Sequence, residues 1–155
     1  EKCRTPLIWA SNFSVGVNVF TAAVDLVSSL LAKAGGYAPY IVEKHHCHKL
    51  DAPSGTAKTL AAVVDKNMDI KPDVASVRVG EIAGIHTVGF EGGCDRITME
   101  HEAFSRQGFA EGAVMAAGMA DAQAEEIRVG HESEAEPKPM VHEFKELFIG
   151  TLSKR

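Results

Sequence analysis

The sequence predicts an α+β domain with an open, mostly four-stranded mixed sheet that helices cover on one face. Four short stretches have the alternating or apolar pattern of strands, two or three have helical spacing, and turns containing Gly or Pro separate them. At 155 residues, the chain can bury roughly two thirds of its unfolded surface. We therefore expect core packing to hold the fold without disulfide bonds.

The predicted elements follow a simple order along the chain. An apolar strand over 7–10 is expected to be buried and to continue from an upstream segment, because no sheet partner is evident nearby. A helix that Asn12 or Ser14 caps follows, and Gly35-Gly36 ends it. The later elements are a strand over 37–48, a helix over 54–66, strands over 76–80, 86–91 and 96–101, and a helix over 109–124.

These elements divide the chain into four parts. Residues 1–13 are predicted to be a hinge or the last strand of a preceding domain, and residues 14–124 the main domain. Residues 125–139 contain five glutamates and two prolines and are predicted to form an acidic flexible loop, because they have too little apolar content to fix a structure. Residues 140–155 regain helical spacing and are predicted to form a C-terminal helix and tail.

Composition narrows the class of partner. A net charge of −5 argues against nucleic acid, because nucleic-acid-binding domains are usually basic. No apolar run reaches the ~20 residues of a membrane helix, so we expect no membrane partner. The three cysteines lie outside any CxxC pair, which is typical of reduced thiols in the cytoplasm. Two of them, Cys47 and Cys94, are expected to pack as small buried hydrophobic residues.

The later strands predict an assembly surface. Their apolar residues are interpreted as lying on both faces of the sheet, and only one face is expected to be covered by helices. Sheet-to-sheet association between subunits would cover the other face. The residues behind this prediction are Val77, Val79, Val88, Phe90, Ile97 and Met99.

The stretch from Glu43 to Thr56, EKHHCHKLDAPSGT, carries the candidate chemistry. It holds three of the chain's seven histidines and two lysines, and it ends in a Ser/Gly/Thr cluster that opens the helix over 54–66. Backbone N–H groups at a helix start carry partial positive charge and bind anions. Imidazoles and an ammonium beside them add proton donors. The stretch therefore predicts a site for a small molecule that bears carboxylates.

Metal binding is the alternative interpretation of the same histidines. Neighbouring side chains on a strand face opposite ways, so only His46 with His48, or His45 with Cys47, could share an ion. Because further ligands have no obvious source, we expect no metal site here. Single histidines inside strands are typical of hydrogen-bonded structural residues, which is the expectation for His86 and His101.

Two segments resemble the signature segments of a known bacterial enzyme family. Residues 12–18, NFSVGVN, and residues 43–56 are similar to those of dihydrodipicolinate reductase (4-hydroxy-tetrahydrodipicolinate reductase), an enzyme family of the diaminopimelate and lysine pathway. Residues 80–87 and 104–113 are similar too, so the resemblance covers about 5–124. It implies a nicotinamide-dependent reductase.

The resemblance also implies a division of labour. The family has an N-terminal Rossmann domain for NADPH or NADH, and a C-terminal α+β domain that binds a small dicarboxylate and builds a homotetramer through its sheets. This chain resembles the second domain. It contains no G-x-G-x-x-G, the cradle of the cofactor pyrophosphate, so we expect the Rossmann domain to be absent and the chain alone to be inactive. A non-catalytic oligomerisation or dicarboxylate-binding module remains the alternative.

Carried over position by position, the resemblance assigns roles to the candidate residues. His45 would be the proton donor or acceptor and Lys49 a proton donor. His46 would hold one substrate carboxylate, and Gly55 with Thr56 the other. The positions implied to contact the cofactor are the hinge residues Ala10, Ser11, Asn12 and Phe13, together with Arg106.

Overall fold

The computed structural model describes residues 6–130 and 141–152, which divide between two compact units. One unit is Gly16–Arg106. The other consists of the described residues before position 16 and after position 106. Each unit is described here by itself.

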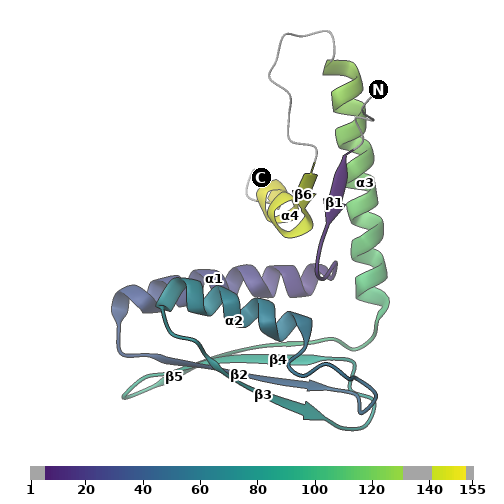
Figure 1. Cartoon of the computed structure of the whole chain (residues 1–155). Coiled ribbons are helices and arrows are strands. Elements are labelled where there is room, and N and C mark those ends of the chain that lie inside the picture. Colours follow the sequence, from purple (N-terminus) through teal and green to yellow (C-terminus); the bar gives the residue numbers. More distant parts are fainter. Residues whose placement is uncertain (1–5, 131–140, 153–155) are drawn as a thin grey trace. The chain divides into compact units, whose positions relative to one another are not determined.

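A four-stranded mixed sheet forms the base of the Gly16–Arg106 unit, as the sequence predicts. The strand order is β3-β2-β4-β5, with β2 and β3 parallel and the other neighbouring pairs antiparallel (Figure 1). The strand bounds are β2 Ala38–His45, β3 Asp73–Arg78, β4 Ile85–Glu91 and β5 Arg96–Glu102.

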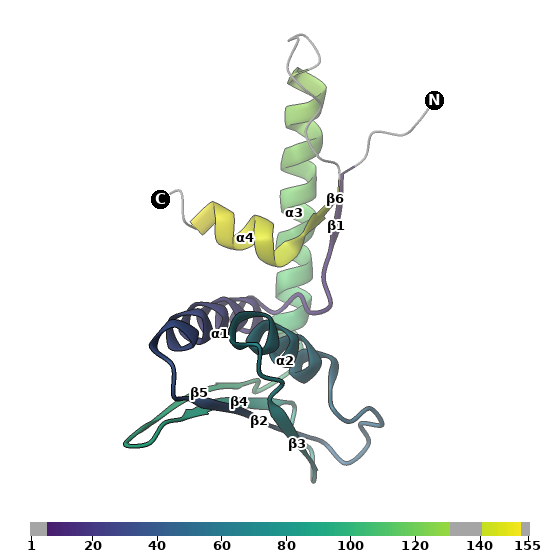
Figure 2. The same cartoon turned by 60° about the vertical axis from the view of Figure 1, so that its left-hand side comes forward.

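Two helices, α1 (Val15–Ala34) and α2 (Gly55–Met68), cover one face of this sheet (Figure 2). Ser54 caps α2 by accepting a hydrogen bond from the Ala57 N–H at 3.2 Å. The core between helices and sheet consists of Phe20, Val24, Leu31, Ile41, Ala57, Leu60, Val64, Val88 and Phe90. This confirms the prediction of an α+β domain with helices on one face.

Helix α1 differs from the sequence-based expectation in one respect. It is 20 residues long and apolar enough to cross a membrane by length and composition, so the expectation that no run reaches that length is wrong. Core helices of soluble proteins pass the same test, and α1 buries Phe20, Val24 and Leu31 in the core beside the sheet. Its length is therefore weak evidence for a membrane.

The uncovered face of the sheet is more polar than the sequence analysis expects. Strand register places Val88, Phe90, Ile97 and Met99 on the helix-covered face and Val77 on the open face, so apolar residues lie on both faces but fewer of the predicted ones face outward. The open face carries Lys44 and a Thr87–Glu100 hydrogen bond of 2.6 Å. Its apolar side chains are Tyr40, Val42, Val77 and Ile85.

The other unit contains β1 (Leu7–Trp9), β6 (Val141–Glu143), α3 (Gln107–Gly130) and α4 (Phe144–Leu152). Strand β1 pairs in parallel with β6, so the first strand does have a partner within the chain. It is also not buried, since Leu7 and Trp9 are exposed. The expectation of a buried strand without a nearby partner is therefore wrong, whereas its continuation from an upstream segment stays a prediction.

The C-terminal part also departs from prediction. Helix α3 runs on to Gly130, six residues into the expected acidic loop over 125–139, and the rest of that loop lies outside the described residues. The predicted helix from 140 onward begins at Phe144 instead, because Val141–Glu143 is taken up by pairing with β1. Phe144 and Phe148 stack in the core of this unit with ring centroids 5.6 Å apart.

One helical glycine allows a very close approach in this unit. A Cβ atom added at Gly112 of α3 would lie 1.8 Å from the backbone carbonyl oxygen of Phe13. No real Cβ comes so near, so the segment before α1 can pack on α3 only because position 112 has no side chain. Ala116 lies one turn further along the helix and is buried in the same core.

Candidate active site

The site forms where strand β2 ends and helix α2 begins. His45 is the last residue of β2, and it is held there by a hydrogen bond from the Val79 N–H to its carbonyl at 3.0 Å. The chain then turns, with the Lys49 N–H donating to the His46 carbonyl at 3.2 Å. Ser54 brings the start of α2 back to the strand, since its backbone N–H donates to Glu43 Oε1 at 3.4 Å.

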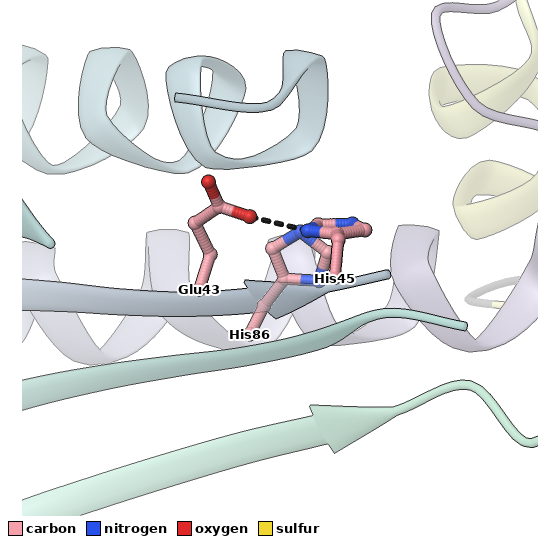
Figure 3. A group of neighbouring side chains, drawn as sticks. All are labelled: Glu43, His45 and His86. Atoms are coloured by element: carbon pink, nitrogen blue, oxygen red, sulfur yellow. Dashed lines mark hydrogen bonds and ion pairs between the residues drawn. The ribbon is translucent and has the colours of Figure 1, made fainter. Parts of the chain in front are cut away.

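Glu43 lies at the centre of a buried polar cluster (Figure 3). Its side chain is fully buried, and one carboxylate oxygen, Oε2, pairs with Nδ1 of His45. The other oxygen, Oε1, accepts a hydrogen bond from the Arg78 guanidinium at 2.7 Å. A buried carboxylate needs such partners, because an isolated buried charge is costly.

These partners keep Glu43 ionised. Burial by itself raises the pKa of the Glu43 carboxyl group, but hydrogen bonds from Arg78, Ser76 and His45 outweigh it and lower the pKa to about 2. The cluster therefore holds a permanent negative charge beside His45 at neutral pH.

His86 lies next to His45 but in a different electrostatic state. The two rings meet edge to face with centroids 5.1 Å apart, and His86 Nε2 is 3.2 Å from the Ser54 hydroxyl (Figure 3). Burial is the main cause that lowers the pKa of His86 to about 4, and the charge of His45 adds to it. His86 is therefore neutral at pH 7. Burial also lowers the pKa of His45, against the opposing effect of Glu43.

The other predicted substrate residues lie on the loop and helix that follow β2. Lys49 is half-buried and pairs with Asp51, with 2.7 Å between Nζ and Oδ1. Gly55 and Thr56 are the first two residues of α2, the helix end at which the backbone carries partial positive charge. His46 follows His45 directly, and its ring lies tilted by 37° against that of His48, with ring centroids 6.0 Å apart.

The predicted cofactor residues fall outside this cluster. Ala10 to Phe13 connect β1 to α1 in the other compact unit, where Asn12 Oδ1 accepts a hydrogen bond from the Ser14 N–H at 2.9 Å. Arg106 is exposed at the end of the Gly16–Arg106 unit. Arg106 and the four hinge residues belong to different units, and their cofactor role stays a prediction.

Within residues 6–130 and 141–152, two groups of side chains have the spacing of metal ligands, and neither is a pair that the sequence suggested. Glu43, His45 and His86 form a buried group, and Cys47, His48 and Glu81 an exposed one. The second group also shows that Cys47 is exposed, as is Cys94, so the prediction that both are buried is wrong. In the buried group, the Arg78 guanidinium on Glu43 disfavours a cation, since like charges repel.

Acid should destabilise the fold through His86. A histidine whose folded pKa is about 4 must stay neutral while the unfolded chain takes up a proton near pH 6.5, so stability present above pH 6.5 is lost as the pH falls to 4. We expect a loss of about 3 kcal/mol in the free energy of unfolding over that range. Urea titrations at several pH values measure it.

His86→Asn should flatten this pH dependence, whereas the same substitution at the exposed His48 should leave it unchanged. Glu43 acts in a lower window, because its stabilisation is complete above pH 4.5 and is lost toward pH 2. An unchanged slope in His86→Asn would show that another group controls the transition.

The residues missed from the sequence are Glu43, Arg78, Ser54 and His86. Glu43 could have been predicted from the sequence, because it lies two residues before His45 and positions i and i+2 of a strand share a face. Arg78 and His86 come from β3 and β4, which pair with β2 so that Arg78 faces His45 and His86 faces Glu43. Only strand register reveals those two contacts.

Comparison with known proteins identifies the domain. Residues 16–132 match the family described as "Dihydrodipicolinate reductase, C-terminus". The chain belongs to this family. Among curated relatives, the 4-hydroxy-tetrahydrodipicolinate reductases of Stenotrophomonas maltophilia K279a and Xylella fastidiosa M23 are 47% and 46% identical over 114 and 115 residues. These matches cover 74% of the chain but only 46% and 47% of the relatives, so the chain spans about half their length.

The fold agrees with a solved member of the family. A dihydrodipicolinate reductase from Paenisporosarcina sp. TG-14, determined with dipicolinate bound, matches 76% of this chain and 50% of its own with a TM-score of 0.64. At 23% sequence identity this likeness speaks for the fold alone. The match to the family covers the whole cluster around Glu43 and His45.

Proposed function

We propose that this chain is the substrate-binding part of a 4-hydroxy-tetrahydrodipicolinate reductase of lysine and diaminopimelate biosynthesis. The observation that carries the proposal is the position of His45, which Glu43 holds beside the start of α2 within the region that matches the family. That arrangement sets a proton-transferring imidazole next to a helix N-terminus that can receive a carboxylate.

The substrate is a small dicarboxylate, and the chain offers two places for its carboxylates. The first is the start of α2, where Gly55 and Thr56 present backbone N–H groups. The second is the basic loop with His46 and Lys49. A helix end and a cationic cluster together fit a planar molecule that carries a negative charge at each side.

The reaction removes the 4-hydroxyl group as water and adds a hydride and a proton to the ring. A nicotinamide cofactor, NADPH or NADH, supplies the hydride when bound. The described residues do not fit its pyrophosphate, since the sequence has no G-x-G-x-x-G, so we assign that site to a part beyond this chain. Hydride arriving at one ring carbon leaves negative charge at its neighbour, and His45 or Lys49 quenches that charge by proton transfer.

Dipicolinate should bind to this chain weakly, and its affinity should fall as salt or pH rises, because its partners are cations. Calorimetry of the 155-residue chain measures both dependences. Lys49→Ala should weaken binding at least tenfold, because it removes one of the cations that face the ligand. Lys66→Ala, which removes an exposed lysine at the far end of α2, is the matched control and should bind as wild type.

An affinity that depends on neither salt nor pH would remove the electrostatic part of this proposal. Binding without turnover in a completed enzyme would instead favour a non-catalytic dicarboxylate-binding module.

We also propose a cytoplasmic homotetramer. Exposed free thiols at Cys47 and Cys94 suit a reducing compartment. The open face of the sheet, with Tyr40, Val42, Val77 and Ile85 around the Thr87–Glu100 hydrogen bond, is the surface through which subunits would associate. Light scattering should report four chains at micromolar concentration. A stable monomer there would contradict the assembly.

A further inference from the structure

We propose that Glu43 is a positioning residue for the reaction: it fixes the tautomer and the orientation of His45 so that Nε2 faces the substrate. The inference rests on the function proposed above, and it goes further because it assigns a role to a residue that the family resemblance does not. Glu43 is fully buried and touches the Nδ1 side of His45 only.

The carboxylate of Glu43 is held in one orientation. Oε2 faces His45, while Oε1 accepts hydrogen bonds from the Arg78 guanidinium at 2.7 Å and from the Ser54 N–H at 3.4 Å. Rotation of the carboxylate would break contacts on both sides at once. A group locked in this way transmits its orientation to the imidazole that it holds.

The charge state of Glu43 decides the tautomer of His45. An ionised carboxylate only accepts hydrogen bonds, so Nδ1 of His45 must carry a hydrogen. In the neutral ring Nε2 then has a free lone pair and can accept a proton, and in the charged ring it can donate one. Either state directs proton transfer to Nε2.

The Nε2 side of the His45 ring faces a glycine. A Cβ atom added at Gly84 would lie 3.1 Å from His45 Nε2, so a side chain at this position would crowd the nitrogen that reacts. Gly84 also adopts a φ of 155°. A glycine here keeps any side chain away from Nε2, while Glu43 closes the Nδ1 side.

Arg78 connects Glu43 to the loop that carries Lys49 and Asp51. The same NH2 group that donates to Glu43 also donates to the backbone carbonyl of Asp51 at 2.6 Å, and Asp51 pairs with Lys49. One guanidinium therefore fixes both the base-orienting carboxylate and the turn that carries the second predicted proton donor. The two hydrogens of this one nitrogen can point to the two acceptors at once, and the planar guanidinium fixes their directions.

The tautomer can be tested on the unmodified 155-residue chain. Nitrogen-15 NMR of the histidine rings at pH 8 should show His45 with hydrogen on Nδ1 and a lone pair on Nε2. A His45 ring with its hydrogen on Nε2 would overturn the proposal, whatever any variant does.

The kinetic test uses Glu43→Gln in a chimera that joins the nucleotide-binding part of the Stenotrophomonas maltophilia relative ahead of this chain. Glutamine keeps the size of the side chain, but its amide can donate to Nδ1 and so favours the other tautomer. We expect kcat to fall about 10- to 100-fold with KM changed less than about threefold. Glu81→Gln, which alters the carboxylate of the exposed His48–Glu81 pair, is the matched control and should not change kcat.

The pKa of His45 gives a readout that a merely structural role would not move. The charged groups facing this ring are Glu43, Lys49 and Arg78, with the imidazole of His86 beside it. Loss of the negative charge should lower the pKa of His45 and shift the pH profile of kcat in the same direction. Wild-type kcat and an unchanged tautomer in a folded Glu43→Gln variant would refute the role, whereas an inactive wild-type chimera would refute the proposed function instead.

Discussion

His45→Ala in the chimera should lower kcat by about 10²–10⁴ while KM changes little, because a proton donor acts in the transition state. Lys49→Ala should lower kcat as well, although the proposed contact of Lys49 with a substrate carboxylate would also give it a share in binding. Steady-state kinetics over a range of pH separate the two roles, since loss of the group that titrates removes its limb from the profile.

Two further substitutions serve as controls for His45→Ala and Lys49→Ala. Thr56→Val should act mainly on KM, because a carboxylate clamp serves ground state and transition state alike. His48→Ala removes an exposed histidine three residues from His45 and should leave kcat unchanged. If both His45→Ala and Lys49→Ala keep wild-type kcat at saturating substrate, the stretch is only a binding site.

Gly112→Ala should cost about 3 kcal/mol in the free energy of unfolding, because the added methyl group would meet the Phe13 carbonyl oxygen at 1.8 Å. The neighbour is backbone, so the strain cannot be relieved by a side-chain rotation. Urea denaturation of the 155-residue chain, followed in the unit that contains α3, measures the loss.

Gly118→Ala is the matched control for this substitution. It lies on the same helix with no atom within 4 Å of the added Cβ. Alanine there should stabilise the chain by up to about 1 kcal/mol, because glycine is the poorer helix former. Equal effects of the two substitutions would show that the close approach to Phe13 is not maintained in solution.

The sheet and its covering helices were predictable because their signals are local. The Ser54 cap begins α2 at Gly55, and the Gly92-Gly93 turn joins β4 to β5. The ends of the strands were harder to predict from the sequence. The predicted strand over 37–48 stops at His45 because the backbone turns at 46–49, and β3 begins at Asp73 because it pairs with Tyr40 of β2.

The second unit and half of the site depend on contacts between distant segments. Residues 141–143 read as helix in isolation, and only pairing with β1 makes them a strand. In the same way, the sequence alone points to His45, but the residues that hold it come from β3, β4 and the start of α2. Hydrophobic periodicity predicts on which face of the sheet a residue lies, but it does not predict which strand pairs beside it.

The most direct test of the account is the rate at which the chimera oxidises a reduced nicotinamide cofactor in the presence of 4-hydroxy-tetrahydrodipicolinate. We expect substrate-dependent oxidation by the chimera and none by the 155-residue chain alone, since on the proposed function the chain would supply the carboxylate site and the proton transfer by His45 but no pyrophosphate cradle. A chimera that folds and binds the nucleotide yet shows no substrate-dependent oxidation would contradict the account, and so would turnover by the chain alone.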